Sequence, residues 1–158
     1  DAVPYSNPNN YIKQSKKIAE DLSKKHKFGV IWGNQFDNTV NTEAHIETTA
    51  NEIWSQTSGM VDGFTCAVGT GGTLAGVSIG LKNKNKNIKI ALSDPMGSSL
   101  YSYIKNNKLE SKGNSITEGI GTGRITKNFE KAIIDDAFQT DDVEALKIVY
   151  DLTNMLVN

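Results

Sequence analysis

Apolar and polar positions along the chain follow two different periods. Residues 8–25 and 42–56 carry apolar side chains at helical spacing, with polar and charged residues between them. Short apolar runs at 29–32, 63–68 and 88–92 predict strands, and Asp94-Pro95 ends the last of them. The first half of the chain therefore predicts helices alternating with short strands.

The second half continues this alternation around a long polar segment. The apolar stretch after Gly72 predicts a helix over about 72–82, and residues 98–105 predict a shorter one. Residues 106–131 are polar and rich in glycine, which indicates a loop of a length that is often functional. A last strand is predicted within 133–140. Asp141 is then placed to cap a helix that runs to about Met155.

Alternating strands and helices predict an α/β fold. Because the strands read as buried on both faces, we expect a mainly parallel sheet with helices on both faces. Ligands of such sheets bind beyond the carboxyl ends of the strands. The turn at 69–73, the pair Asn34-Gln35 and Asp94 all lie at such ends.

Composition and charge exclude several classes of function. The 158 residues are 37% apolar and 22% charged, with a net charge of −1, and this implies no bulk attraction to nucleic acid or to an anionic membrane. Of the 17 basic residues Arg124 is the only arginine, whereas nucleic-acid-binding surfaces are usually richer in it. No apolar run approaches the ~18 residues of a membrane span.

The single cysteine and the two histidines suggest structural roles. Cys66 lies in a predicted buried strand, cannot form a disulfide within the chain, and favours a reducing, cytoplasmic setting. His45 lies within a helical pattern and is expected to make structural hydrogen bonds, while His26 is expected at the surface. No Cys/His spacing typical of zinc is present, so no metal site is predicted.

A glycine-rich turn between a predicted strand and a predicted helix is the most specific local signal. Residues 68–74 read Val-Gly-Thr-Gly-Gly-Thr-Leu. Glycines allow close approach of the backbone, and the free N–H groups and dipole of a helix N-terminus favour an anion. The predicted phosphate ligands are Gly69, Thr70, Gly71, Gly72 and Thr73. A turn that serves packing alone is the alternative.

Two nucleotide motifs fit this turn poorly. No Gly-Lys-Ser/Thr follows the glycines, which excludes a Walker A loop. The dinucleotide fingerprint G-x-G-x-x-G matches at Gly69 and Gly71 but meets leucine at position 74. Asp94 lies at roughly the distance of the acidic residue that binds a ribose. A Rossmann-type nucleotide-binding domain therefore stays open as a weaker interpretation.

The order and spacing of the motifs along nearly the whole chain closely resemble the cysteine synthase (O-acetylserine sulfhydrylase) family of fold-type II pyridoxal-phosphate enzymes. The segments that carry the resemblance are Asn34-Gln35-Phe36-Asp37-Asn38, His45-Ile46-Glu47-Thr48-Thr49, Gly69 to Gly76, Asp94-Pro95, Glu118 to Gly121 and Arg124-Ile125-Thr126. The resemblance implies that residues 1–41 are the tail end of a smaller N-terminal domain. Residues 42–158 would be part of a larger domain that binds the phosphate of the cofactor.

The same resemblance assigns candidate ligands. It implies that residues Gly69 to Thr73 wrap the phosphate of pyridoxal 5'-phosphate, which supplies the electron sink for carbanion chemistry. It places Gln35 near the substrate carboxylate, although a role in tethering a loop is equally open. It places Gly119, Ile120 and Gly121 at the active-site entrance, where the alternative is an ordinary turn.

For function, the resemblance implies a central-to-C-terminal fragment of an enzyme that converts O-acetyl-L-serine and sulfide to L-cysteine and acetate. The segment that carries the Schiff-base lysine in the family is not found, so the chain alone is expected to be inactive. Lys82 is expected at a solvated helix end. Family members are usually homodimers. Relatives of cystathionine β-synthase or serine/threonine dehydratase, and a non-catalytic binding domain, are the alternatives.

Overall fold

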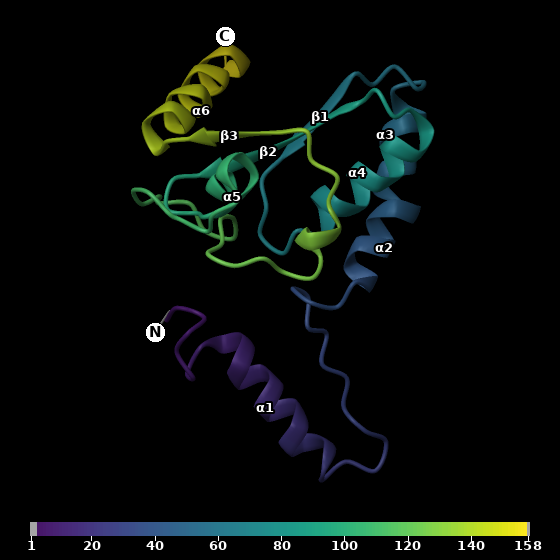
Figure 1. Cartoon of the computed structure of the whole chain (residues 1–158), viewed down its shortest axis with the longest axis vertical. Coiled ribbons are helices and arrows are strands. Elements are labelled where there is room, and N and C mark those ends of the chain that lie inside the picture. The colour runs from purple at the N-terminus through teal and green to yellow at the C-terminus, as the bar shows by residue number, and fades with distance from the viewer. Residues whose placement is uncertain (1–2, 158) are drawn as a thin grey trace.

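A computed structural model describes residues 3–157 and has three parallel strands at its centre (Figure 1). The strands are β1 (Gly63–Cys66), β2 (Lys89–Pro95) and β3 (Asp136–Thr140), in the spatial order β1-β2-β3. Gly63 pairs with Lys89, and Ala91 pairs with Asp136. The helices are α1 (Tyr11–Ser23), α2 (Val40–Glu47), α3 (Thr49–Gln56), α4 (Gly72–Lys84), α5 (Leu100–Asn106), the 3-10 helix η1 (Phe129–Lys131) and α6 (Asp142–Val157). The parallel α/β class predicted from the sequence is confirmed.

The core lies between the central strand and α4. Ile90 and Leu92 of β2 are fully buried, as are Leu74, Val77 and Leu81 of α4. Their spacing explains both elements, because alternate residues of a strand and every third or fourth residue of a helix face the same side. The predicted helix over 72–82 and its packing on the sheet are confirmed.

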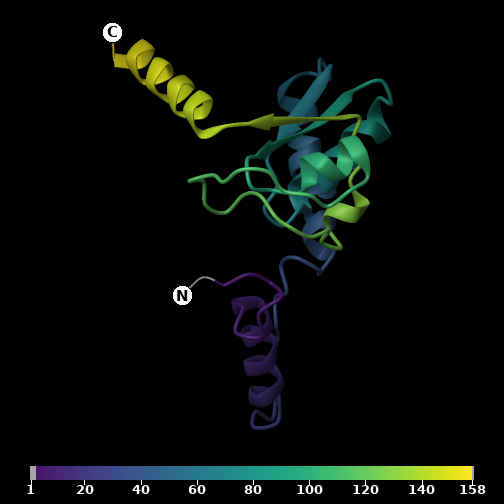
Figure 2. The same ribbon diagram turned by 60° about the vertical axis from the view of Figure 1, so that its left-hand side comes forward.

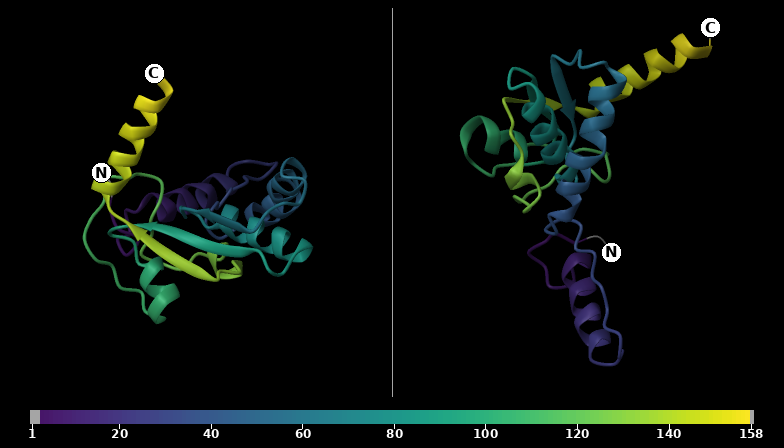
Figure 3. Two further views of the ribbon diagram at one scale, coloured as in Figure 1. Left: turned by 90° about the horizontal axis from the view of Figure 1, so that it is seen from above. Right: turned by 90° about the vertical axis from the view of Figure 1, so that its right-hand side faces the viewer.

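Helices α2 and α3 pack against α4 through small residues. A Cβ on Gly76 would lie 2.4 Å from Cβ of His45, and one on Gly80 would lie 2.4 Å from Cβ of Ala50. The helices can approach this closely only because glycine lacks a side chain at both positions. Figure 3 shows α5 on the other side of the sheet from α2 and α3. The expected helices on both faces are therefore present.

The strands are less buried than the sequence pattern indicates. Only β2 has fully buried side chains at regular alternate positions, whereas β1 alternates between exposed and half-buried residues. Phe138 in β3 is 57% exposed. Each of these two strands pairs with β2 alone within the described residues, so its outer edge lacks a partner there.

The terminal helices stand away from the sheet (Figure 2). None of the residues of α1 is buried. Helix α6 follows β3 and begins at the expected cap, because the Asp141 carboxylate accepts a hydrogen bond from the backbone N–H of Glu144 at 2.8 Å. Within residues 3–157, the helices are too short or too polar to cross a membrane.

The strand predicted at 29–32 is wrong. These residues are irregular, Gly29 adopts a left-handed φ of 78°, and the Ile31 side chain is 97% exposed. An apolar run forms a strand only where another strand offers backbone partners, and a left-handed residue at its start interrupts the extended conformation. The apolar run at 29–32 has β-propensity, but propensity alone does not show that a partner strand lies beside it.

Other boundaries shift by a few residues. The helix predicted over 42–56 is two helices that meet at Thr48, where φ is −108° and ψ is −77°. Strand β2 continues through Pro95, which stands at its end where no ladder N–H is needed. The Asp94 carboxylate accepts a hydrogen bond from the N–H of Tyr101 in α5 at 2.8 Å.

Candidate cofactor and substrate site

The glycine-rich turn joins the carboxyl end of β1 to the N-terminus of α4. Gly71 is the N-cap of this helix, has a φ of 91°, and offers no side-chain oxygen to the first helical turn. The Thr70 hydroxyl takes part of this role, because its oxygen lies 3.3 Å from the N–H of Gly72. The result is a helix N-terminus whose remaining first-turn N–H groups and positive dipole end are suited to an anion.

The glycines of this turn are packed against other loops. A Cβ on Gly69 would lie 2.3 Å from the carbonyl oxygen of Gly119, and one on Gly71 would lie 2.6 Å from the backbone nitrogen of Phe129. A Cβ on Gly72 would lie 2.2 Å from Oδ1 of Asn41. Packing against backbone therefore requires glycine at positions 69 and 71, whether or not the turn also binds a phosphate, whereas a side chain at position 72 would have to displace the Asn41 amide.

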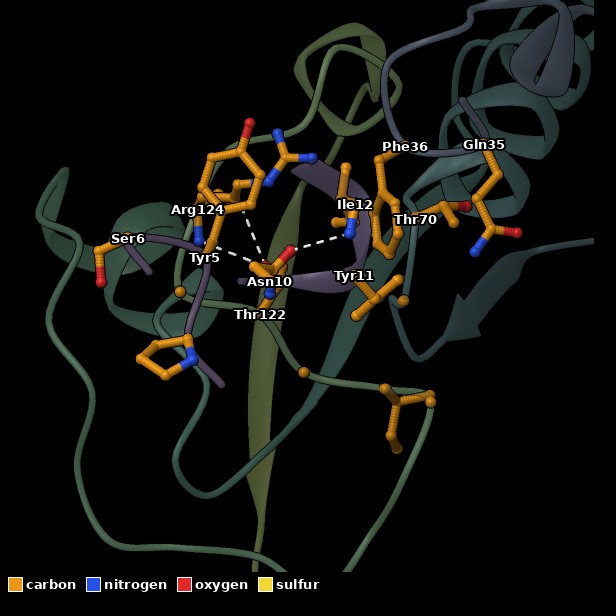
Figure 4. Close-up of a pocket in the computed structure, with 16 residues that line it drawn as sticks. Tyr5, Ser6, Asn10, Tyr11, Ile12, Gln35, Phe36, Thr70, Thr122 and Arg124 are labelled. Atoms are coloured by element: carbon orange, nitrogen blue, oxygen red, sulfur yellow. Dashed lines mark hydrogen bonds between the residues drawn. The ribbon is translucent and has the colours of Figure 1, made fainter. Parts of the chain in front are cut away.

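A cavity of about 970 Å³ opens beside this turn. Most of the site residues predicted from the sequence line it, namely Gln35, Gly69, Thr70, Gly119, Ile120 and Gly121. Figure 4 shows Gln35 beside Thr70 on one side of it. Gly71 and Gly72 are buried within the turn and Thr73 is exposed, and none of these three residues lines the cavity. The structure thus gathers two distant glycine loops and Gln35 around one space.

The residues fit a phosphorylated cofactor. Donors are present at the helix N-terminus, and the Thr70 oxygen already accepts from Asn41 Nδ2 at 3.0 Å, which leaves its own proton free to donate. The volume is at the upper end of the range typical of small-molecule sites. The groups that would hold the phosphate of such a cofactor are the first-turn N–H groups of α4 and the Thr70 hydroxyl.

Two asparagines that sequence reasoning missed hold the Gln35 segment in place. Asn128 is fully buried, and its Nδ2 donates to the carbonyl oxygens of Gln35 at 2.9 Å and Phe36 at 2.8 Å. Its Oδ1 accepts from the hydroxyl of Thr42 at 2.7 Å. Asn41 also donates to the Gln35 carbonyl, at 2.9 Å. The sequence around the two asparagines did not predict this role, because their contacts join residues up to 93 positions apart.

An ion pair between Arg124 and Asp37 also holds the segment that contains Gln35. Arg124 donates through Nη1 and Nη2 to the two carboxylate oxygens of Asp37, each at 3.1 Å. Burial alone would raise the pKa of Asp37, but hydrogen bonds from Arg124 and from the N–H of Lys127, together with their charges, lower it below its usual value. Asp37 is therefore a carboxylate at neutral pH.

The remaining candidate side chains have structural partners. His45 hydrogen-bonds through Nδ1 to Thr49 Oγ1 at 2.9 Å and through Nε2 to Thr73 Oγ1 at 3.1 Å, as a structural histidine is expected to do. His26 is exposed, as predicted. Cys66 packs against the core, and burial raises the pKa of its thiol to about 11, so it is a poor nucleophile.

Lys82 is not the solvated helix end expected from the sequence. Its side chain is 13% exposed, its Nζ lies 2.8 Å from Asp135 Oδ2, and it donates to the carbonyl of Ile88 at 3.0 Å. The partners lie just before β2 and just before β3, so the local sequence of α4 could not predict them. Lys82 ties α4 to the segments that lead into β2 and β3, and it does not line the candidate cavity.

The fold and the site together define an α/β domain with a glycine-rich turn and a cavity at the carboxyl end of a parallel sheet. Residues 3–154 match the sequence model of the family described as "Pyridoxal-phosphate dependent enzyme". The chain belongs to this family, whose cofactor is pyridoxal phosphate.

Within this family, the chain is similar to cysteine synthases and to solved structures of related enzymes. The chain is 46% identical over 154 residues to cysteine synthase 1 of Emericella nidulans, an alignment that covers 94% of the chain and 40% of that relative. Among solved structures, a hydrogen sulfide-producing enzyme of Fusobacterium nucleatum matches with a TM-score of 0.72 and 34% identity over 87% of this chain and 44% of the other. O-acetyl serine sulfhydrylase isoform 3 of Entamoeba histolytica matches with a TM-score of 0.69 and 37% identity, over 84% and 37%. The chain thus spans about 40% of the length of its curated relative.

Proposed function

We propose that this chain forms the phosphate-binding part, and part of the substrate pocket, of a cysteine synthase-like enzyme. The reaction converts O-acetyl-L-serine and sulfide to L-cysteine and acetate. The observation that carries the proposal is the N-terminus of α4, with glycine as its N-cap, beside a cavity that Gln35 and the loop Gly119–Gly121 line. Pyridoxal phosphate, when bound, supplies the electron sink for chemistry at the substrate α-carbon.

Each part of the site has a proposed task in binding. The N–H groups and hydroxyls of residues 69–73 hold the phosphate, helped by the dipole of α4. The Gln35 side-chain amide donates to the substrate carboxylate. The backbone of residues 119–121 borders the entrance and limits access of water. These tasks position the reactants, which is how a binding site accelerates a reaction between two bound groups.

We further propose that the Schiff-base lysine comes from outside this chain. Of the described residues that line the cavity, Arg124 is the only basic one. Both of its Nη atoms already donate hydrogen bonds to Asp37. The chain alone would then bind the cofactor weakly through its phosphate and give no turnover. The intact enzyme is proposed to be a cytoplasmic homodimer. The lone cysteine supports the compartment, and the family resemblance supports the dimer.

One set of assays tests the proposed reaction. The longer protein that we propose contains this chain is supplied with pyridoxal phosphate and O-acetyl-L-serine, and cysteine formation with sulfide is compared with cystathionine formation with homocysteine. Faster turnover with sulfide is expected. Preference for homocysteine would indicate a cystathionine β-synthase, and release of a 2-oxo acid from serine or threonine would indicate a dehydratase. Sedimentation velocity of the same protein tests the dimer.

A binding experiment on the 158-residue chain separates the phosphate site from the chemistry. Pyridoxamine 5'-phosphate is the probe, because it cannot form a Schiff base with a lysine. Tighter binding of this probe than of unphosphorylated pyridoxamine is expected. Equal binding of the two would contradict a phosphate site at residues 69–73. A titration with NADH covers the nucleotide alternative, and saturable binding would favour it. Cysteine production by the chain alone would show that the lysine is not missing.

A further inference from the structure

Arg124 is the point at which three segments around the cavity meet. Its guanidinium carbon lies 4.4 Å from the centre of the Tyr5 ring and 5.5 Å from that of Phe36. Figure 4 shows the Tyr5 ring over the Arg124 side chain. The two Nη atoms hold Asp37, so one side chain links the N-terminal segment, the Gln35 segment and the loop that follows Gly119.

The link between Arg124 and Asp37 is of the strong kind. Two parallel N–H···O bonds fix both the distance and the orientation of the partners, which a single contact cannot do. The side chains are only 21% and 20% exposed, so water screens them less than a surface pair. Asp37 also accepts from the backbone N–H of Lys127 at 3.0 Å, and this adds a third hydrogen bond to the same segment.

Both ends of the link lie next to predicted ligand residues. Asp37 follows Gln35 by two positions, and its own N–H donates to the carbonyl of Asn34 at 3.0 Å. On the other side, the N–H of Gly121 donates to the carbonyl of Val68 at 2.8 Å, which joins this loop to the turn that begins at Gly69. A shift of Arg124 would therefore move both walls of the cavity relative to each other.

We infer that Arg124 and Asp37 are positioning residues, which hold Gln35 and the loop Gly119–Gly121 at the separation that the amino-acid substrate requires. This inference rests on the proposed function. The guanidinium group already engages Asp37 with both Nη atoms, so it acts through the Gln35 segment and does not bind the substrate carboxylate itself. Loosening the pair should weaken substrate binding more than it slows the chemical step.

The sign of the effect of Asp37→Asn separates the two roles that Arg124 can have. If the pair positions Gln35, the variant loses the two charge-assisted hydrogen bonds between Arg124 and the position-37 carboxylate. KM for O-acetyl-L-serine then rises about tenfold while kcat changes little. If Arg124 bound the substrate directly, the same variant would free its guanidinium group and lower KM. Arg124→Lys keeps the charge but loses the fork, so positioning predicts a rise in KM for this variant as well.

Asp135→Asn is the matched control. Asp135 also joins an ion pair, with Lys82, and also accepts a backbone N–H, from Ile90 at 2.8 Å, but it does not line the cavity. It should leave KM for O-acetyl-L-serine unchanged. Any general loss of stability from breaking a partly buried ion pair will appear in this control too.

Amide hydrogen exchange gives a readout that does not depend on activity. In the unliganded protein, Asp37→Asn and Arg124→Lys should each speed exchange in both peptides, 34–38 and 119–127, whereas Asp135→Asn should not. If the wild-type protein makes no cysteine, the proposed function fails while the exchange experiment still tests the link. An active wild type whose Asp37→Asn variant has unchanged or lower KM, or whose two peptides exchange as before, would overturn the inference.

Discussion

Gly69 and Gly119 lie so close together that a Cβ on Gly69 would stand 2.3 Å from the Gly119 carbonyl oxygen. These residues belong to the two glycine-rich loops of the site, which are 50 positions apart in the chain by their numbers. Both residues line the cavity, so the contact holds two of its loops together. It also ties the geometry of the predicted phosphate turn to that of the predicted substrate loop.

Gly69→Ala should separate the two loops. The methyl group would overlap backbone and not a flexible side chain, so we expect a loss of about 1–3 kcal/mol in the free energy of unfolding. Affinity for pyridoxamine 5'-phosphate should fall as well. Gly123→Ala is the control, since a Cβ there meets nothing within 4 Å, and it should change stability by less than about 0.5 kcal/mol. Urea denaturation and the probe titration measure both, and wild-type behaviour of Gly69→Ala would contradict the close packing.

Asn128→Ala should destabilise the protein from within the site. The change leaves the buried Thr42 hydroxyl without its acceptor. It also removes the side-chain donor shared by the Gln35 and Phe36 carbonyls, although Asn41 still donates to Gln35. We expect a loss of about 2–4 kcal/mol in the free energy of unfolding. Asn87→Ala, at an exposed turn, should have little effect. Equal stability of the two variants by urea denaturation would show that the Asn128 bonds add nothing.

Gly80 and Ala50 offer a test of helix packing by compensation. Gly80→Ala places its methyl 2.4 Å from Cβ of Ala50 and should cost about 1–3 kcal/mol. Adding Ala50→Gly removes the overlap, because the next atom near that methyl is the Ile46 carbonyl oxygen at 3.5 Å. The double variant should therefore be more stable than the sum of the single changes predicts, by about 1 kcal/mol or more. Simple additivity in thermal or urea unfolding would contradict direct contact between α3 and α4 here.

Asp94 should make stability depend on pH. The residue is fully buried, and Oδ1 has no hydrogen-bond partner among the described residues. Burial raises the pKa of this carboxyl, although hydrogen bonds from Tyr101, Ser98 and Leu100 act in the opposite direction. Because the folded state then holds its proton more tightly than the unfolded state, Asp94 contributes stability at low pH that is lost as pH rises through the raised pKa.

Asp94→Asn removes this titration and isolates it. We expect wild-type protein to gain stability relative to Asp94→Asn as pH falls from 7 to about 4, the ordinary range for an aspartate. Urea denaturation of both proteins at several pH values measures the difference. A difference that is constant with pH, or that grows in the opposite direction, would show that the hydrogen bonds and not burial decide the pKa.

The sequence predicted the elements that local patterns specify. The apolar spacing after Gly72 and the small residues that precede it located α4 and the turn before it, and the cap at Asp141 located the start of α6. Helix periodicity, capping and strand-to-helix turns depend on neighbours a few positions away, so they can be read along the chain. The motif order was enough to indicate the family.

Contacts between distant segments were decided only by the tertiary structure. The fork between Arg124 and Asp37 joins residues 87 positions apart, and the partners of Asn128 lie as far away. The run at 29–32 has strand-like composition but meets no strand, and Lys82 has helix-end composition but lies against Asp135. A single sequence carries the chemistry of each side chain, but pairing depends on which segments the fold brings together. For this chain, the sequence determined the glycine-rich turn and the family, and the tertiary structure determined how Gln35 and the second glycine loop are held around that turn.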